Sequence, residues 1–468
     1  MINMERKNIE EIKFDSSKFQ DFVNKNNNGG LVRFLDRLGK LPSNFDKKPL
    51  IKLLKNENDK VRALVIKNLA KLSDISLLEL YTRILKSESS STVRREAVSA
   101  IGRLRNEVAI NSLINLLNDK DPEVILQAIR GLFVFKDKEN VKKQLSRLEN
   151  HPNEIVQEVI KKEFKEKSLN KNLIKHSESL DCMKNTIVFG DVRESIRSVP
   201  SDSVHLTFTS PPYYNARDYS IYRSYNEYLN FLEEVFREVH RITKEGRFFV
   251  LNTSPIIIPR VSRQHSSKRY PIPYDIHYTL TKIGWEFVDD IIWVKPEASV
   301  KNRIGGFLQH RKPLGYKPNA RTENIMVYRK KTDKLIDWNI KQYNHQIIER
   351  SKVNGSYETS NVWQIDPTFD KTHSAVFPIE LCDRVIKYYS FIGDLVFDPF
   401  AGSGTVGKSA MNLNRNFFLT EVNKKYIDRI KENLGLNVYY NNKKPTFLNT
   451  REFNVVIKNE LNTTKRSD

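Results

Sequence analysis

The stretch Leu395-Val-Phe-Asp-Pro-Phe-Ala-Gly-Ser-Gly-Thr405 decides the fold of the C-terminal half of the chain. Its first three residues predict a buried strand, and the residues that follow the stretch predict a helix. Gly402 and Gly404 lie in the turn between them, where glycine lets the backbone approach a ligand beside the free N–H groups of a helix start. The acid Asp398 ends the strand and no Gly-x-x-x-x-Gly-Lys pattern is present, so the turn is not predicted to hold a phosphate.

Short apolar runs of this kind alternate with helical stretches from residue 186 onward. Strands that alternate with helices predict an α/β domain built around a mostly parallel sheet. The predicted strands are Thr186–Phe189, His205–Phe208, Phe248–Leu251, Ile291–Val294, Ile325–Tyr328, Leu395–Phe397 and Phe417–Leu419.

A second acid, Glu421, ends the strand that follows the glycine turn. In dinucleotide sites an acid at this place holds the two hydroxyls of a ribose. Asp398 and Glu421, with the glycine turn between them, therefore suit a cofactor that carries an α-amino group and a ribose but no phosphate. S-adenosylmethionine fits this description, and we predict it as the cofactor.

The second motif, Thr209-Ser-Pro-Pro-Tyr213, directly follows a predicted strand. Two consecutive prolines stiffen the backbone and remove two N–H donors, so that the carbonyls there point outward as acceptors. Ser210 Oγ and the Pro211 carbonyl can then both accept hydrogen bonds from one exocyclic amino group. Tyr213 offers a flat surface on which a base can stack.

Together the two motifs resemble the amino-methyltransferases of DNA, the restriction–modification enzymes that methylate exocyclic amines with S-adenosylmethionine. The likeness covers about residues 185–440. Ser-Pro-Pro-Tyr is similar to the cytosine-N4 branch, whereas Asp- or Asn-Pro-Pro-Tyr is usual for adenine-N6. The tetrapeptide precedes the glycine turn, as in the permuted β class. The resemblance therefore implies a Rossmann-like methyltransferase fold with permuted motif order.

The resemblance also implies two sets of site residues. Asp191 would face the adenine of the cofactor, and His373-Ser-Ala-Val-Phe-Pro378 would cover its methionine end. The residues with an implied catalytic role are Ser210, Pro211, Pro212 and Tyr213. The residues with an implied cofactor-binding role are Asp191, Phe377, Pro378, Asp398, Phe400, Gly402, Gly404, Thr405 and Glu421.

Methylation of a base inside a duplex requires base flipping, at a cost of a few kcal/mol. Acceptors at Ser210 and Pro211 would localise the lone pair of the amine for direct attack on an activated methyl group, without a metal. Cytosine-C5 methylation is disfavoured, because it needs a nucleophilic cysteine and neither Cys182 nor Cys382 lies in a Pro-Cys turn. An adenine-N6 enzyme stays open, and so does a non-catalytic DNA-binding or scaffold protein.

The charge balance favours a polyanionic partner. The net charge is +21, from 78 Lys and Arg against 57 Asp and Glu, and double-stranded DNA is the simplest polyanion for such a chain. We expect target recognition within about residues 298–372, and the resemblance implies a cognate restriction endonuclease as a further partner. The predicted DNA-binding residues are Arg260, Arg263, Lys301, Arg303, Arg311, Lys312, Lys317 and Arg321.

The N-terminal third contains a repeat. Val61, Val93, Val124 and Val156 recur 32, 31 and 32 residues apart, and an amphipathic helix with a polar, helix-capping turn precedes each. Helix pairs that bury one face each must stack, which predicts an α-solenoid. The segment resembles the HEAT repeats over about residues 45–165, and both an interaction or spacer role and direct DNA contact stay open.

These patterns predict five consecutive parts of the chain. They are an N-terminal extension (1–44), the HEAT-like solenoid (45–165), a linker (166–185), the methyltransferase domain (186–440) and a C-terminal tail (441–468).

The composition excludes several other classes of protein. Two cysteines are too few for a disulfide framework or a structural zinc site, and we expect no metal. The longest apolar runs fall far short of the ~20 residues that a membrane span needs, and the first residues lack the apolar core of a signal peptide. We therefore expect a cytoplasmic protein without a membrane partner.

Overall fold

A computed structural model of the protein describes residues 9–467 apart from 10, 14, 43, 165–174, 215–221, 263, 301–312, 315, 317, 356, 369–375 and 436–443. The chain divides into two compact units, residues 1–173 and 174–468, and the division falls inside the stretch predicted as a linker. Within the described ranges, no helix has both the length and the apolar character needed to cross a bilayer.

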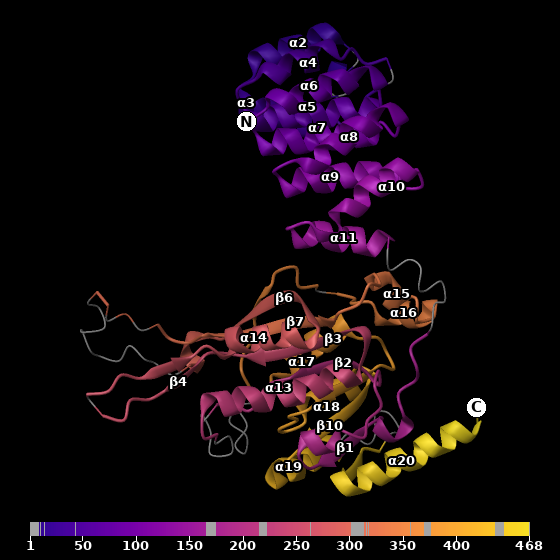
Figure 1. The fold of residues 1–468 in the computed structure, drawn as a ribbon. Coiled ribbons are helices and arrows are strands. Elements are labelled where there is room, and N and C mark those ends of the chain that lie inside the picture. Colours follow the sequence, from indigo (N-terminus) through magenta and orange to yellow (C-terminus); the bar gives the residue numbers. More distant parts are fainter. Residues whose placement is uncertain are drawn as a thin grey trace. The chain divides into compact units, whose positions relative to one another are not determined.

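The N-terminal unit is all-helical, and its helices form consecutive pairs that stack on one another (Figure 1). The second helices of neighbouring pairs are in contact, α5 with α7 and α7 with α9. The predicted α-solenoid is thereby confirmed. The helices are α2 (Ser16–Lys25), α3 (Asn28–Arg37), α4 (Lys48–Lys52), α5 (Asp59–Leu69), α6 (Leu78–Ser87), α7 (Ser91–Arg103), α8 (Ile110–Asn115), α9 (Pro122–Leu132), α10 (Glu139–Ser146) and α11 (Glu154–Phe164).

A fully buried valine anchors the second helix of each repeat. Three of these helices begin at a side-chain cap, because Asn58, Asp121 and Asn153 accept backbone N–H groups of the first turn. Ser90 occupies the corresponding place before α7 without making a side-chain cap. The anchoring valines are Val61, Val93, Val124 and Val156.

Ion pairs join neighbouring repeats. Arg62 of α5 pairs with Glu88 of the next repeat at 2.8 Å, and Arg95 of α7 pairs with Asp121 at 3.1 Å. The cation lies on a second helix, and the acid lies at or just before the start of the following second helix. The same arrangement joins Arg94 to Asp119.

The C-terminal unit is built on a nine-stranded sheet with the order β11-β1-β10-β9-β2-β3-β7-β6-β8. Strands β11 to β3 are parallel, whereas β7 runs antiparallel to both β3 and β6. A separate ribbon pairs β4 with β5. The strands are β1 (Thr186–Phe189), β2 (Val204–Thr209), β3 (Thr243–Thr253), β4 (Ile256–Ile258), β5 (Lys268–Tyr270), β6 (Trp285–Val294), β7 (Thr322–Lys330), β8 (Val362–Gln364), β9 (Leu395–Asp398), β10 (Asn416–Glu421) and β11 (Thr446–Asn449).

Each face of this sheet carries its own hydrophobic core and its own helices, which confirms the predicted α/β class. Helices α12, α13, α14 and α20 pack on one face, and α17, α18 and α19 pack on the other. The helices of this unit are α12 (Val192–Ser195), α13 (Tyr225–Ile242), α14 (Ile272–Ile283), α15 (Ile336–Ile340), α16 (His345–Ser351), α17 (Ile379–Tyr389), α18 (Thr405–Asn412), α19 (Lys424–Gly435) and α20 (Thr450–Ser467).

The strand order brings the two sequence motifs together. Strands β9 and β10 lie between β1 and β2 in the sheet, although both follow β2 in the chain. The chain leaves β2 toward β3 on one side and leaves β9 toward β10 on the other. The carboxyl ends of β2 and β9 therefore form a switch point of the kind where α/β sheets bind ligands.

The C-terminal segment differs from the predicted tail. Strand β11 pairs in parallel with β1, Thr446 lying opposite Thr186, so it forms the edge of the sheet. Phe453 and Ile457 of α20 are fully buried in the core of one sheet face. Their spacing of one helical turn was hidden in a sequence otherwise rich in Lys, Asn and Thr. The predicted N-terminal extension likewise contains α2 and α3, and α3 packs on α5.

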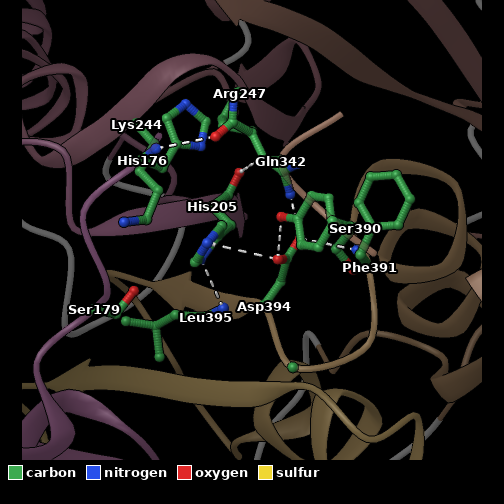
Figure 2. Close-up of polar contacts among 12 residues, drawn as sticks. His176, Ser179, His205, Lys244, Arg247, Gln342, Ser390, Phe391, Asp394 and Leu395 are labelled. Atoms are coloured by element: carbon green, nitrogen blue, oxygen red, sulfur yellow. Dashed lines mark hydrogen bonds and ion pairs between the residues drawn. The ribbon is translucent and has the colours of Figure 1, made fainter. Parts of the chain in front are cut away.

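A buried polar cluster occupies the amino ends of β2, β3 and β9, the edge of the sheet opposite the two motifs (Figure 2). Arg247 of β3 forms an ion pair with Asp394, which directly precedes β9, and both side chains are almost fully buried. Tyr343, in the turn between α15 and α16, donates to Asp394 at 2.5 Å. Helices α15 and α16 thus pack at the amino edge, so this part of residues 298–372, the range within which target recognition is predicted, lies at the edge opposite the two motifs.

Candidate active site

A cavity of about 230 Å³ opens at the carboxyl ends of β1, β2, β9 and β10. It is lined by residues of both sequence motifs, so the glycine turn and the proline-stiffened turn share one pocket. Of the predicted catalytic and cofactor-binding residues, those that line the cavity are Asp191, Ser210, Pro211, Pro212, Tyr213, Phe377, Asp398, Phe400, Gly402, Thr405 and Glu421.

One hydrogen bond joins the two motifs directly. Thr209 Oγ1, at the end of β2, donates to Asp398 Oδ1, at the end of β9, over 2.6 Å. The Phe400 N–H donates to the same oxygen at 3.0 Å, and the described residues supply no hydrogen bond to Oδ2. Burial raises the pKa of Asp398 to about 7, although both hydrogen bonds act to lower it. The carboxyl group is therefore costly to ionise unless a cation lies beside it.

Glu421 holds the glycine turn in place. Its carboxylate accepts the Gly402 N–H and the Asn423 N–H, each at 2.8 Å. Gly402 has φ +51°, a left-handed conformation that glycine adopts without strain. Burial, together with the nearby charge of Asp398, raises the pKa of Glu421 to about 7. The cavity thus contains two buried carboxyl groups whose ionisation is disfavoured.

Two predicted cofactor residues lie outside the cavity lining. Gly404 forms the N-cap of α18 with φ +80°, and a Cβ there would lie 3.1 Å from Ile430 Cγ1. Its role in this structure is to let α18 start close to α19. Pro378 precedes α17 as its N-cap, whereas its neighbour Phe377 reaches the cavity. The first part of the predicted cover, residues 373–375, lies outside the described ranges.

An aromatic wall borders the cavity. Phe377 stacks on Phe208 of β2 with ring centroids 4.8 Å apart and an interplanar angle of 11°. Tyr222 and Phe231 also line the cavity, and neither was predicted from the sequence. Phe231 belongs to the apolar stripe of α13, which the sequence cannot distinguish from ordinary core. Asn423 also lines the cavity and was not predicted. Its position two residues after Glu421, a predicted cofactor residue, is a signal in the sequence that could have identified it.

Asp191 lies at the mouth of the cavity and is already engaged. It caps α12 and pairs with Arg193 at 2.8 Å. Burial acts to raise its pKa, but the hydrogen bonds from Arg193 outweigh burial and lower the pKa overall. The preceding Gly190 cannot carry a side chain, because a Cβ would lie 1.9 Å from Thr450 Oγ1. This contact explains why a glycine follows the end of β1.

The hydroxyl of Tyr213 is held by a buried polar network. It donates to Glu323 Oε2 at 3.3 Å, and Asn252 Nδ2 donates to the same oxygen at 2.6 Å. Lys295 forms an ion pair with the other oxygen of Glu323. Burial raises the pKa of Tyr213, so its hydroxyl stays protonated, and Ser210 also hydrogen-bonds with that hydroxyl. The network holds Tyr213 and with it the Ser-Pro-Pro-Tyr turn, and no pattern in the sequence pointed to Glu323.

The predicted DNA-binding residues are only partly described. Arg260 is exposed just after β4, in the ribbon that follows the carboxyl end of β3. Arg321 donates from Nε to the Lys295 carbonyl at 3.0 Å, at the start of β7. Both therefore lie at the edge of the sheet that carries the cavity. The residues outside the described ranges are Arg263, Lys301, Arg303, Arg311, Lys312 and Lys317.

The charged residues that line the cavity are all acidic. They are Asp191, Asp398 and Glu421, and the described lining contains no Lys or Arg. Such a lining complements a cation and opposes a phosphate group. Among the described residues, no group of three His, Cys, Asp or Glu side chains is arranged to hold a metal ion.

The family described as DNA methylase matches residues 204–432, and HEAT repeats match residues 48–132. The orphan methyltransferase M.BamHII of Bacillus amyloliquefaciens is 30% identical over 249 residues, which cover 50% of this chain and 89% of that protein. The Type II methyltransferase M.MwoI of Methanothermobacter wolfeii is 28% identical over 271 residues, which cover 54% of this chain and only 35% of M.MwoI.

Among solved structures, the putative DNA modification methylase TTHA0409 from Thermus thermophilus, complexed with S-adenosyl-L-methionine, is 26% identical. It aligns with a TM-score of 0.45 over 56% of this chain and 98% of its own. The match to most of M.BamHII at 30% identity, together with the family match over the α/β unit, identifies this chain as a member of the N6/N4 DNA methylase family.

Proposed function

We propose that this chain transfers a methyl group from S-adenosylmethionine to the exocyclic N4 amine of a flipped cytosine in duplex DNA. The observation that carries the proposal is the hydrogen bond between Thr209 and Asp398, because it sets the Ser-Pro-Pro-Tyr turn beside the glycine turn in one cavity. A methyl donor held by one turn would then face an amine held by the other.

The residues of the cavity suit this cofactor. S-adenosylmethionine would supply a methyl group that is already activated by a sulfonium cation, and its ammonium group is a second cation. Asp398 and Glu421 would hold it, since a bound cation offsets the cost of ionising a buried carboxyl group. Asp398 Oδ2 is the natural acceptor for the ammonium group, and Glu421 retains lone pairs for the ribose hydroxyls.

The catalytic turn would prepare the amine for attack. Ser210 Oγ and the Pro211 carbonyl would accept hydrogen bonds from the two N–H groups of the amine and draw them out of the plane of the base, which localises the lone pair on nitrogen. Ser210 acts to lower the pKa of Tyr213, and its hydroxyl oxygen has two lone pairs with which it could accept a hydrogen bond from the amine. Most of the rate would come from positioning and from a dry pocket.

The choice of cytosine N4 rests on Ser210, and adenine N6 is the alternative. The exposed ribbon with Arg260, and the segment that begins after β6, would hold the duplex around the flipped base. Because several relatives are Type II methyltransferases, we infer a restriction endonuclease of the same sequence specificity as partner.

Nucleoside analysis tests this proposal. Duplex DNA is incubated with the full chain and S-adenosylmethionine and is then digested to nucleosides. The nucleosides are identified by mass spectrometry. N4-methylcytosine is the expected product. N6-methyladenine alone would overturn the cytosine assignment in favour of the alternative. The absence of any methylated base, in a preparation that binds the cofactor in a calorimeter, would overturn the enzymatic assignment altogether.

A further inference from the structure

The N-terminal unit carries a set of cations at equivalent positions of its repeats. These positions lie 6 and 10 residues after the anchoring valine, so they are about one helical turn apart. The first lies on the second helix, and the second lies at its last residue or in the 3-10 turn that continues it. The described positions of this kind that are not basic are Ser99 and Val134, and none is acidic. The cations are Lys67, Lys71, Arg103, Arg130 and Lys162, and we call them the cationic face.

The packing of the second helices makes these cations neighbours. A Cβ added to Gly102 would lie 3.0 Å from the Cα of Gly131, so the backbones of α7 and α9 touch at that point. Arg103 and Arg130 directly flank this contact. A pair of glycines here lets two cations of successive repeats approach more closely than ordinary helix packing would allow.

The cations of this face differ from the paired arginines that join neighbouring repeats. Arg62 and Arg95 are paired across repeats with Glu88 and Asp121. Among the described residues, no member of the cationic face forms an ion pair. Lys71 instead donates to neutral acceptors, including the Gly39 carbonyl at 2.7 Å.

The electrostatics of Lys71 show that positive charge accumulates on this face. Burial lowers the pKa of Lys71, and the charges of Lys67, Lys13 and Arg103 lower it further. Asp36 acts in the opposite direction and does not cancel these effects. Cations that destabilise one another in the free protein are stabilised when an anion binds between them.

We propose that the cationic face binds the phosphate backbone of duplex DNA without reading its sequence. The partner rests on the proposed function, which makes DNA the polyanion that this chain must meet. A set of cations repeated along stacked helices suits a partner whose charges are themselves repeated. Phosphate contacts add affinity and set orientation, while base contacts determine sequence choice.

The test compares two variants of the full chain that lose the same charge. In the first, the five residues of the cationic face are changed to Gln. In the matched control, five cations of the same unit that lie outside the face are changed to Gln. These control residues are Lys55, Lys86, Lys120, Lys142 and Lys143, which are exposed and form no ion pair within the described ranges. Affinity for a fluorescently labelled duplex of arbitrary sequence is measured by anisotropy between about 50 and 200 mM salt.

Each lost phosphate contact lowers the magnitude of the slope of log K against log salt by about 0.9, so the loss of all five contacts in the first variant is expected to lower it by about 4.5. The control variant is expected to stay near the wild-type slope. Equal slopes for the two variants would overturn the proposal and leave an acidic protein as the partner of this face. S-adenosylmethionine affinity, unchanged in both variants, verifies folding of the α/β unit. Because DNA binding is measured without turnover, the comparison of the two variants can be interpreted even if the proposed methylation is wrong.

Discussion

The affinity for S-adenosylmethionine should fall steeply as the pH is lowered through 7. Asp398 and Glu421 are buried at the cavity, 2% and 8% exposed, and the pKa of each is raised to about 7. A cationic ligand binds the ionised carboxylates and not the protonated acids. Cofactor binding must therefore release any proton that these carboxyl groups carry, and the affinity falls at any pH at which they are protonated.

The size of the effect follows from these pKa values. With a pKa of about 7, the ionised fraction of one carboxyl group falls from about 0.8 at pH 7.5 to about 0.03 at pH 5.5. The association constant should then fall about 25-fold if one group must ionise, and about 600-fold if both must. Isothermal titration calorimetry of the full chain across this pH range measures the change directly.

Asp398→Asn is the matched control, because its amide is neutral at every pH. Its affinity at pH 7.5 should be below that of the wild type, and its pH dependence should be shallower by one proton. The folding stability of the ligand-free chain should depend on pH in the opposite direction. Because folding raises the pKa of these groups, the ligand-free chain loses stability as the pH rises from about 4 to about 7. A wild-type affinity that stays constant from pH 7.5 to pH 5.5 would refute this account of both carboxyl groups.

Substitutions at three positions test other parts of the structure. Ser210→Ala should lower single-turnover kcat by about 10²–10³-fold, with cofactor affinity unchanged in a calorimeter; comparable turnover would contradict its role as acceptor. Glu323→Ala should lower kcat about tenfold or more, because it releases the Tyr213 hydroxyl. Glu323→Gln should restore part of the lost kcat, because an acceptor oxygen remains. Identical kinetics in the two variants would contradict a role of Glu323 in positioning Tyr213. Asp394→Asn should cost about 3–5 kcal/mol of unfolding free energy in denaturant titrations, since it leaves a buried guanidinium uncompensated, while the cofactor dissociation constant stays the same.

The sequence predicted the parts of the fold that rest on short-range patterns. All seven predicted strands are strands, because runs such as Phe417–Leu419 are buried on both faces of the sheet and are therefore continuously apolar. The antiparallel pairing of β6 and β7 was not predicted. No helix of an ordinary crossover length is described between these two strands, and parallel neighbours need such a crossover.

Much of the candidate site was also visible in the sequence, because its acids and glycines follow directly after strands. Glu323 was not, since its partners Tyr213, Asn252 and Lys295 come from three distant segments that meet only in the folded sheet. The range predicted to contain target recognition includes α15 and α16, and the cavity lies at the carboxyl edge of the sheet. Tyr343 instead contacts Asp394 at the opposite edge, and a sequence does not reveal which end of a sheet an inserted helix covers.

The position of β9 and β10 between β1 and β2 has a consequence for biosynthesis. A ribosome releases β1 and β2 long before the two strands that separate them, so the nascent chain cannot assemble the centre of its sheet until β9 and β10 have also been synthesised. A product of premature termination before Leu395 would contain the Ser-Pro-Pro-Tyr turn and lack the partner strand that completes the pocket. The pocket can therefore form only after β10 has been translated, and until then β1 and β2 lack the strands that pair between them.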